Sequence, residues 1–201
     1  MNEGFRRGFR SPSSEDGGNV PEGLVAGPAR IRQLAKAEFA RARRYGYALC
    51  YALCRIDRID SLADLYGQDA RRTLMERLAQ LFRARSRLTD LVGRFGDDRL
   101  LWILPHTELE GATLAAERIR RALAETEVQS GTKRIRVTLS IGVACYQDRN
   151  ALFHDSILFQ AERALEQAQG VGGNCVEAHP LAPPADAPDA AAERTQDDPS
   201  P

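Results

Sequence analysis

The chain has 201 residues and is 43% hydrophobic, which suits one domain with a buried core. Its 28 basic and 28 acidic side chains cancel, so the overall charge favours neither nucleic acid nor an anionic membrane as a partner. No apolar run approaches the roughly 20 residues that cross a bilayer, and the basic N-terminus lacks the apolar centre of a secretory signal. We therefore predict a cytoplasmic protein that binds neither nucleic acid nor membranes.

The two ends of the chain lack the pattern of a folded domain. Residues 1–28 are predicted to be a flexible leader, because residues 11–28 are rich in Gly, Ser, Pro and Glu. Residues 179–201 are rich in Ala, Pro and Asp and are predicted to be a disordered tail. Residues 29–178 are then expected to form a single domain.

The first half of this domain predicts a helix, a strand and two further helices. Apolar residues recur at helical spacing over residues 29–44. Residues 47–54 are apolar on both faces, which is typical of a central strand covered on each side, and Arg55 follows at its carboxyl end. Residues 59–85 are helical in pattern, with a break at Gly67 that separates two helices.

The second half alternates between strands and helices. The predicted elements are a hairpin with arms at residues 88–95 and 100–104, a helix at 108–125, a strand at 135–145, a helix at 152–169 and a short strand at Val176. The strand at 135–145 has the cleanest signal, because its apolar residues recur with a strict period of two. The order β-α-α-β-β-α-β predicts an α+β fold with a mostly antiparallel central sheet flanked by helices.

The four cysteines show no paired CxxC spacing. Cys50, Cys54 and Cys145 fall within apolar strand patterns, where a reduced thiol packs as a small hydrophobic group. Cys50 and Cys54 share one face of a strand, but a zinc site needs four convergent ligands. We therefore expect core thiols, no metal site and no cofactor.

Several motifs resemble those of one known family. Residues 94–100 read Arg-Phe-Gly-Asp-Asp-Arg-Leu and resemble the signature turn of diguanylate cyclase (GGDEF) domains, Gly-Gly-Asp/Glu-Glu-Phe after Arg-Tyr or Arg-Phe. Residues 55–68 resemble the family's first motif and match it at Asp57, Asp64, Tyr66 and Gly67. Residues 138–144 and 161–174 resemble the family's later strand and its closing segment. The resemblance extends over about residues 22–177 and implies a GGDEF-like fold.

The departures from the family pattern imply a degenerate active site. The resemblance places Arg55 and Arg99 where the family has the carboxylates that hold magnesium on GTP, and hard divalent cations need carboxylate oxygens. Ala63 and Arg72 stand where the family reads guanine. The degenerate active-site positions are Arg55, Ala63, Arg72, Gly96, Asp97, Asp98 and Arg99. We expect no catalytic residues and no enzyme activity, with Asp97 and Asp98 as ordinary turn residues.

One family feature is intact. Residues 87–90 read Arg-Leu-Thr-Asp and occupy the position of the family's inhibitory product site, Arg-x-x-Asp, while Arg118 aligns with a further arginine of that site. An arginine can pair with guanine O6 and N7 or with phosphate, and a carboxylate can accept from guanine N1–H and N2–H. The resemblance thus implies a receptor for cyclic di-GMP, a bacterial second messenger, that binds through Arg87, Asp90 and Arg118. It would signal to an unidentified protein partner, and ligand-promoted homodimerisation is a further hypothesis.

Other interpretations of the same residues stay open. Arg87 and Arg118 are also compatible with solvated surface residues, with Asp90 as a simple salt-bridge partner. The domain would then be a scaffold that binds a partner without a ligand. Arg55, Arg72 and Arg99 could instead form a basic pocket that captures a phosphate or nucleotide without metal. Residual cyclase activity is the remaining alternative.

Overall fold

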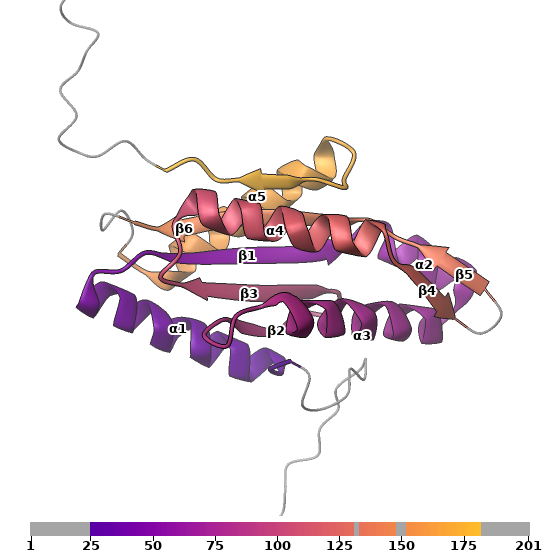
Figure 1. The fold of residues 1–201 in the computed structure, drawn as a ribbon, viewed down its shortest axis with the longest axis horizontal. Coiled ribbons are helices and arrows are strands. Elements are labelled where there is room, and N and C mark those ends of the chain that lie inside the picture. Colours follow the sequence, from indigo (N-terminus) through magenta and orange to yellow (C-terminus); the bar gives the residue numbers. More distant parts are fainter. Residues whose placement is uncertain (1–24, 131–132, 148–151, 182–201) are drawn as a thin grey trace, which may run out of the picture.

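A five-stranded sheet forms the centre of the computed structural model, which describes residues 25–130, 133–147 and 152–181 (Figure 1). The strand order is β2-β3-β1-β6-β7, and every pair is antiparallel except β6 with β7. The strands are β1 (Leu49–Ile56), β2 (Leu91–Phe95), β3 (Arg99–Pro105), β6 (Leu139–Tyr146) and β7 (Val176–Ala178). The predicted α+β fold with a mostly antiparallel sheet is confirmed.

Helices cover both faces of this sheet. They are α1 (Pro28–Tyr45), α2 (Ile59–Tyr66), α3 (Gln68–Arg85), α4 (Leu109–Ala124) and α5 (His154–Gly170). α2, α3 and α4 share one apolar core with the sheet, and α1 and α5 share the other. Figure 1 shows α4 in front of the strands and α5 behind them. β6 is buried along its whole length because it lies between the two cores. No helix in the described ranges has the length and apolarity to cross a membrane.

The strand predicted at residues 135–145 is wrong as a single element. β5 (Lys133–Arg136) instead pairs with β4 (Glu127–Ser130) in a separate two-stranded hairpin, and β6 begins at Leu139. The period of two continues through the break because Val137, between the two strands, is also buried. Alternation alone therefore did not reveal where one strand ends and the next begins.

Ordered structure extends beyond the predicted ends of the domain. Ala26 pairs with Gly93 of β2, and α1 begins at Pro28, so part of the segment assigned to the leader is folded. His179 N–H donates to the Val143 carbonyl at 2.7 Å, one residue past the predicted domain end. The rest of the predicted leader, residues 1–24, and of the predicted tail, residues 182–201, lies outside the described residues.

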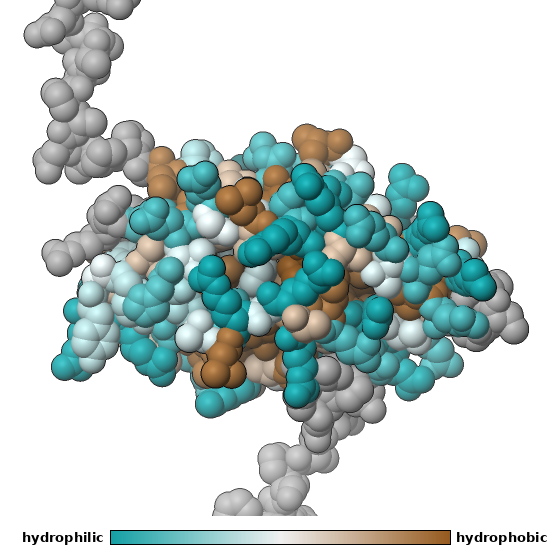
Figure 2. Space-filling model, in the orientation of Figure 1, coloured by the Kyte–Doolittle hydropathy of each residue, from teal (hydrophilic) through white to brown (hydrophobic). Residues whose placement is uncertain are grey.

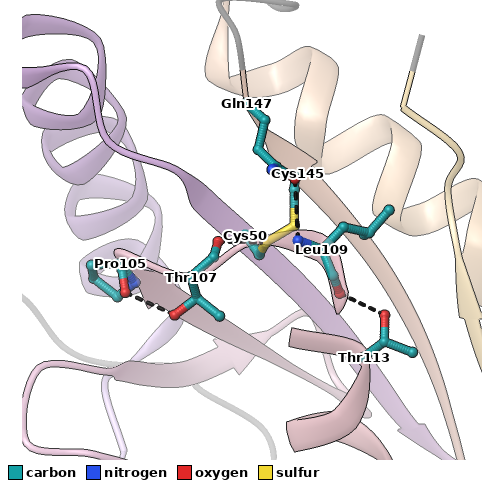
Figure 3. The surroundings of a disulfide bond; sticks show 7 residues. All are labelled: Cys50, Pro105, Thr107, Leu109, Thr113, Cys145 and Gln147. Atoms are coloured by element: carbon teal, nitrogen blue, oxygen red, sulfur yellow. Dashed lines mark hydrogen bonds between the residues drawn. A yellow bond between two sulfur atoms is a disulfide. The ribbon is translucent and has the colours of Figure 1, made fainter. Parts of the chain in front are cut away.

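A disulfide joins two central strands, so the prediction of reduced core thiols is wrong for this pair. Cys50 on β1 lies directly opposite Cys145 on β6, with 4.0 Å between their Cα atoms, and the two are bonded. Cys54 and Cys175 are free. Figure 3 shows the disulfide beside Thr107, in the loop after β3, and Leu109, at the start of α4. The sequence pattern placed both cysteines in strands, but it did not show that the two strands are neighbours in this register.

Gly142 of β6 allows close contact between the sheet and α5. A Cβ atom added at this position would lie 2.1 Å from the Leu165 backbone nitrogen and 2.2 Å from the Ala161 carbonyl oxygen. These neighbours are backbone atoms of a helix, which move only if the whole helix moves. The glycine in the Ser-Ile-Gly-Val stretch is therefore a packing requirement of this fold.

Candidate functional site

The β2–β3 turn places the signature residues at the end of the central strands. Phe95 pairs with Arg99, so residues 96–98 form the loop, and Gly96 has a left-handed φ of +72°. Asp97 and Asp98 do not share this conformation, so only the glycine is required by the backbone. The loop brings Asp98 to the carboxyl end of β1.

Arg55 and Arg99 are both engaged by carboxylates. Arg55 donates from Nε to Asp98 Oδ2 at 2.5 Å and from Nη2 to Asp60 Oδ2 at 2.7 Å. Arg99 donates from Nη1 to Glu162 Oε1 at 3.0 Å, and its guanidinium lies 5.3 Å from the centre of the Phe95 ring. Guanidinium groups have no electron pair to offer a metal ion. Within the described part of the chain, no group of three or more His, Cys, Asp or Glu side chains is arranged to hold a metal.

The two positions where the resemblance places guanine contacts lie in different surroundings. Ala63 on α2 is buried. Arg72 on α3 donates to Asp69, one turn away, at 3.0 Å, and both side chains are exposed. Arg71, rather than Arg72, reaches Asp60 at 3.5 Å. The three arginines of the alternative phosphate pocket therefore each have a carboxylate partner of their own.

Asp57 has a structural role that the sequence did not indicate. Its carboxylate accepts hydrogen bonds from Thr138 Oγ1 and Ser140 Oγ, both at 2.6 Å, and from the Asn174 N–H at 2.9 Å. Thr138 directly precedes β6, Ser140 lies on β6, and Asn174 lies in the loop after α5. Asp57 therefore holds the end of β1 to β6 and to the closing segment.

A second cluster lies on the α3–α4 side of the sheet, in a pocket of about 190 Å³. The structure brings Arg87, Asp90 and Arg118 together there. The lining residues are Arg85, Arg87, Asp90, Trp102, Leu104, Thr107, Gly111, Ala115, Arg118 and Ile119. Arg85, Trp102 and Thr107 are additions that sequence reasoning missed. The face that carries α3 and α4 is mostly hydrophilic, with smaller hydrophobic patches between the polar side chains (Figure 2).

The Arg-x-x-Asp segment is a closed turn and not part of a hairpin arm, because β2 begins only at Leu91. The Asp90 N–H donates to the Arg87 carbonyl at 3.1 Å, and Asp90 Oδ2 accepts from the Arg87 N–H at 2.9 Å. The spacing of three residues is what allows both bonds. Asp90 thus bonds the backbone of Arg87 and forms no ion pair with its guanidinium.

Positive charge exceeds negative charge around this pocket. Over the residues that the structure describes, Arg85, Arg87 and Arg118 form no ion pair. Asp90 is the acidic residue among the lining residues. The rim is therefore net positive, which suits an anionic ligand.

The neighbours of Arg118 on α4 behave differently. Arg120 donates to both carboxylate oxygens of Glu117, at 2.7 and 2.6 Å, and Arg121 donates to Glu117 at 2.8 Å. The hydrogen bonds from Arg120 are the main reason why the pKa of Glu117 falls to about 2. Arg120 also donates to Asn174 Oδ1 at 2.6 Å, which ties α4 to the loop after α5. Arg120 and Arg121 are thus paired with Glu117, while Arg118 lines the pocket and forms no ion pair among the described residues.

Comparison with known proteins identifies the fold. The family model described as "Diguanylate cyclase, GGDEF domain" matches residues 28–175. Diguanylate cyclase A of Treponema denticola is 32% identical over 122 residues, which are 60% of this chain and 32% of the relative. Diguanylate cyclase DgcM of Escherichia coli is 31% identical over 152 residues, which are 76% of this chain and 34% of the relative.

A solved structure has the same fold. The GGDEF domain of DgcB from Caulobacter crescentus, crystallised in complex with c-di-GMP, superimposes with a TM-score of 0.74 at 19% identity and covers 83% of this chain and 98% of that one. This chain belongs to the GGDEF diguanylate cyclase domain family. It spans about a third of the length of the two relatives described above.

Proposed function

We propose that this domain is a catalytically inactive GGDEF domain that acts as a receptor for cyclic di-GMP. The ligand binds at Arg87, Asp90 and Arg118, and the domain passes the signal to a protein partner. One contrast carries the proposal. The arginines at the old active site are neutralised by carboxylates, whereas those around the pocket between α3 and α4 are exposed and unpaired in the described chain.

The ion pairs at the old active site oppose catalysis. Phosphoryl transfer by this kind of enzyme depends on metal ions that position and neutralise the phosphates. Arg55 and Arg99 supply positive charge where those ions would sit, and Asp98 is already bonded to Arg55. A metal ion would have to displace these pairs and overcome the repulsion of two guanidinium groups. We therefore do not expect this chain to have the cyclase activity for which its relatives are named.

The dimensions and charge of the second pocket favour a ligand that only partly enters it. Its volume of about 190 Å³ is below the roughly 300–1,000 Å³ of pockets that enclose a drug-sized ligand. A purine base fits such a space, and its phosphates would remain at the surface. Arg87 and Arg118 lie at that surface, where bidentate pairing with phosphate or with guanine O6 and N7 is strong.

Titration calorimetry tests the proposal. The unchanged protein is expected to bind cyclic di-GMP and to give no heat with GTP and magnesium. Arg87→Ala is expected to weaken cyclic di-GMP binding by roughly 10-fold to 100-fold, because it removes a charged hydrogen-bond donor. Arg83→Ala removes the same charge from an exposed site on α3 outside the pocket and is the control. Equal affinities for the two variants would overturn the assignment of the site.

The surroundings of the pocket favour a protein contact that depends on the ligand. Leu88, at the tip of the Arg87–Asp90 turn, is fully exposed, and Leu114, one turn before Arg118 on α4, is 61% exposed. Apolar side chains beside a charged rim are typical of protein interfaces. We expect a partner protein or a second copy of the chain to cover them once the ligand is bound. Light scattering with and without cyclic di-GMP would show a homodimer as a doubled mass, and an unchanged mass would exclude it.

A further inference from the structure

Three buried polar atoms without partners gather at the pocket between α3 and α4. In the described part of the chain, Trp102 Nε1, Asp90 Oδ1 and Ser86 Oγ are buried and have no hydrogen-bond partner within it. Trp102 and Asp90 line the pocket, and Ser86 lies between two other lining residues, Arg85 and Arg87. Buried polar groups in native proteins are almost always paired. Their gathering at one pocket indicates that a polar ligand group completes them.

Trp102 is held in place by its neighbours and not by its N–H group. It lies on β3, is 2% exposed, and packs edge-on against Phe82 of α3 with 5.2 Å between ring centres. Its backbone pairs with Val92 on one side and Ala52 on the other. A phenylalanine would satisfy the same packing. The indole N–H is therefore a buried hydrogen-bond donor, without a partner among the described residues, on a side chain that lines the pocket.

We propose that Trp102 adds a second guanine contact to the one expected from Asp90, so that the two residues together select guanine in the bound nucleotide. This inference rests on the proposed cyclic di-GMP site and adds a specificity residue to it. Asp90 Oδ1 accepts from guanine N1–H and N2–H, and the Trp102 N–H donates to guanine O6. The other oxygen of Asp90 is used by the Arg87 N–H, so the carboxylate is fixed in orientation before the ligand arrives.

The donor and acceptor pattern explains why adenine would be rejected. Guanine presents an acceptor, O6, next to the donors N1–H and N2–H. Adenine carries a donor amino group where guanine has O6, and an acceptor nitrogen where guanine has N1–H. The Trp102 N–H would then meet a donor and the Asp90 carboxylate would meet an acceptor. Mismatches of buried polar groups give strong discrimination, because both partners lose their bonds with water and gain nothing.

The first test uses the unchanged protein and needs no substitution. The chain contains one tryptophan, so a ¹⁵N-labelled sample gives a single indole N–H signal. Saturating cyclic di-GMP is expected to shift this signal downfield and to slow its exchange with solvent. Cyclic di-AMP at the same concentration is expected to do neither. Binding of cyclic di-GMP without a change in the indole signal would overturn the role of Trp102 and leave the receptor proposal standing.

The second test measures the ratio of affinities for the two dinucleotides. Trp102→Phe keeps an aromatic ring against Phe82 but removes the donor. It is expected to weaken cyclic di-GMP binding about threefold to tenfold and to leave cyclic di-AMP binding unchanged, so selectivity falls by that factor. Phe82→Leu disturbs the same packing without removing a donor and is expected to preserve the ratio. An unchanged ratio in Trp102→Phe would refute the inference. No binding of cyclic di-GMP by the unchanged protein would instead refute the receptor proposal, and this inference with it.

Discussion

Arg55 on β1 and Arg99 on β3 lie directly opposite each other in the sheet, and each is bonded to a carboxylate from another element. Like charges at opposed positions destabilise a strand pair. Here Asp98 and Asp60 neutralise one guanidinium and Glu162 the other. The two positions predicted to have lost metal-binding carboxylates are thus part of a set of ion pairs that link β1, β3, α2 and α5.

Replacing Arg55 and Arg99 with carboxylates should create a metal site without creating cyclase activity. We expect the unchanged protein to bind no Mn²⁺ at this site and to turn over no GTP. Arg55→Asp combined with Arg99→Glu releases Asp98 and supplies new carboxylates, so Mn²⁺ binding should appear in electron paramagnetic resonance titrations. GTP turnover should still be absent, because Ala63 and Arg72 provide no guanine contact. The control pair Arg55→Lys and Arg99→Lys keeps the charges and should bind no Mn²⁺. GTP turnover by the unchanged protein would contradict this account.

Arg118 should matter for ligand binding far more than its neighbour Arg121. Arg118→Ala is expected to weaken cyclic di-GMP binding by roughly 10-fold to 100-fold, since it removes a charged donor from the pocket rim. Arg121→Ala removes an exposed surface pair with Glu117 and should change affinity less than twofold. Calorimetry on both variants gives the comparison, and equal losses would mean that only the net charge of α4 matters.

Gly142 should tolerate no side chain. Gly142→Ala forces a methyl group into the backbone of α5, and we expect the free energy of unfolding to fall by about 3 kcal/mol. Gly170, the last residue of α5, has nothing within 4 Å of an added Cβ, so Gly170→Ala should be neutral or slightly stabilising. Urea denaturation of both variants distinguishes the two sites. A stable Gly142→Ala protein would show that α5 can move away from β6.

Glu117 should make the stability depend on acid pH. Hydrogen bonds from Arg120 lower its pKa from 4.5 to about 2 in the folded protein. A depressed folded pKa stabilises the protein above the unfolded pKa, and this contribution is lost as the pH falls from about 4.5 to about 2. Glu117→Gln should therefore lower the melting temperature at neutral pH, and the difference from the unchanged protein should shrink as the pH approaches 2. A difference that is independent of pH would show that the carboxylate charge is not responsible.

Counting reactive thiols tests the disulfide. Denatured protein that has not been reduced should expose two reactive thiols, those of Cys54 and Cys175. After reduction it should expose four. Because the bond closes a loop with a sequence separation of 95 residues, its reduction should lower stability by up to about 4 kcal/mol. Cys54→Ala should respond to reduction in the same way as the unchanged protein. Four reactive thiols before reduction would restore the prediction of reduced cysteines.

Local patterns predicted the main elements because each depends on neighbours in the chain. The apolar run that forms β1, the break at Gly67 between α2 and α3, and the helical spacing of α4 and α5 were all visible in the sequence. The β4–β5 hairpin was missed because β5 continues the period of two that leads into β6, and β4 has only four residues. Residues 88–90 of the Arg87–Asp90 turn were predicted as part of a strand, because the side-chain bond to the backbone that closes the turn has no effect on hydrophobic periodicity.

The sequence by itself determined the fold class. It also predicted, from the family resemblance, that Arg55 and Arg99 replace metal-binding carboxylates and that Arg87, Asp90 and Arg118 bind a ligand. Only the tertiary structure decided which charges are neutralised and which are exposed. In it, Cys50 is bonded to Cys145, Asp57 accepts a hydrogen bond from Ser140 of β6, and the N–H of Trp102, a residue that lines the pocket, is buried without a partner among the described residues. Each of these depends on contacts between residues far apart in the chain. Such contacts arise from strand register and helix packing, which no local pattern encodes.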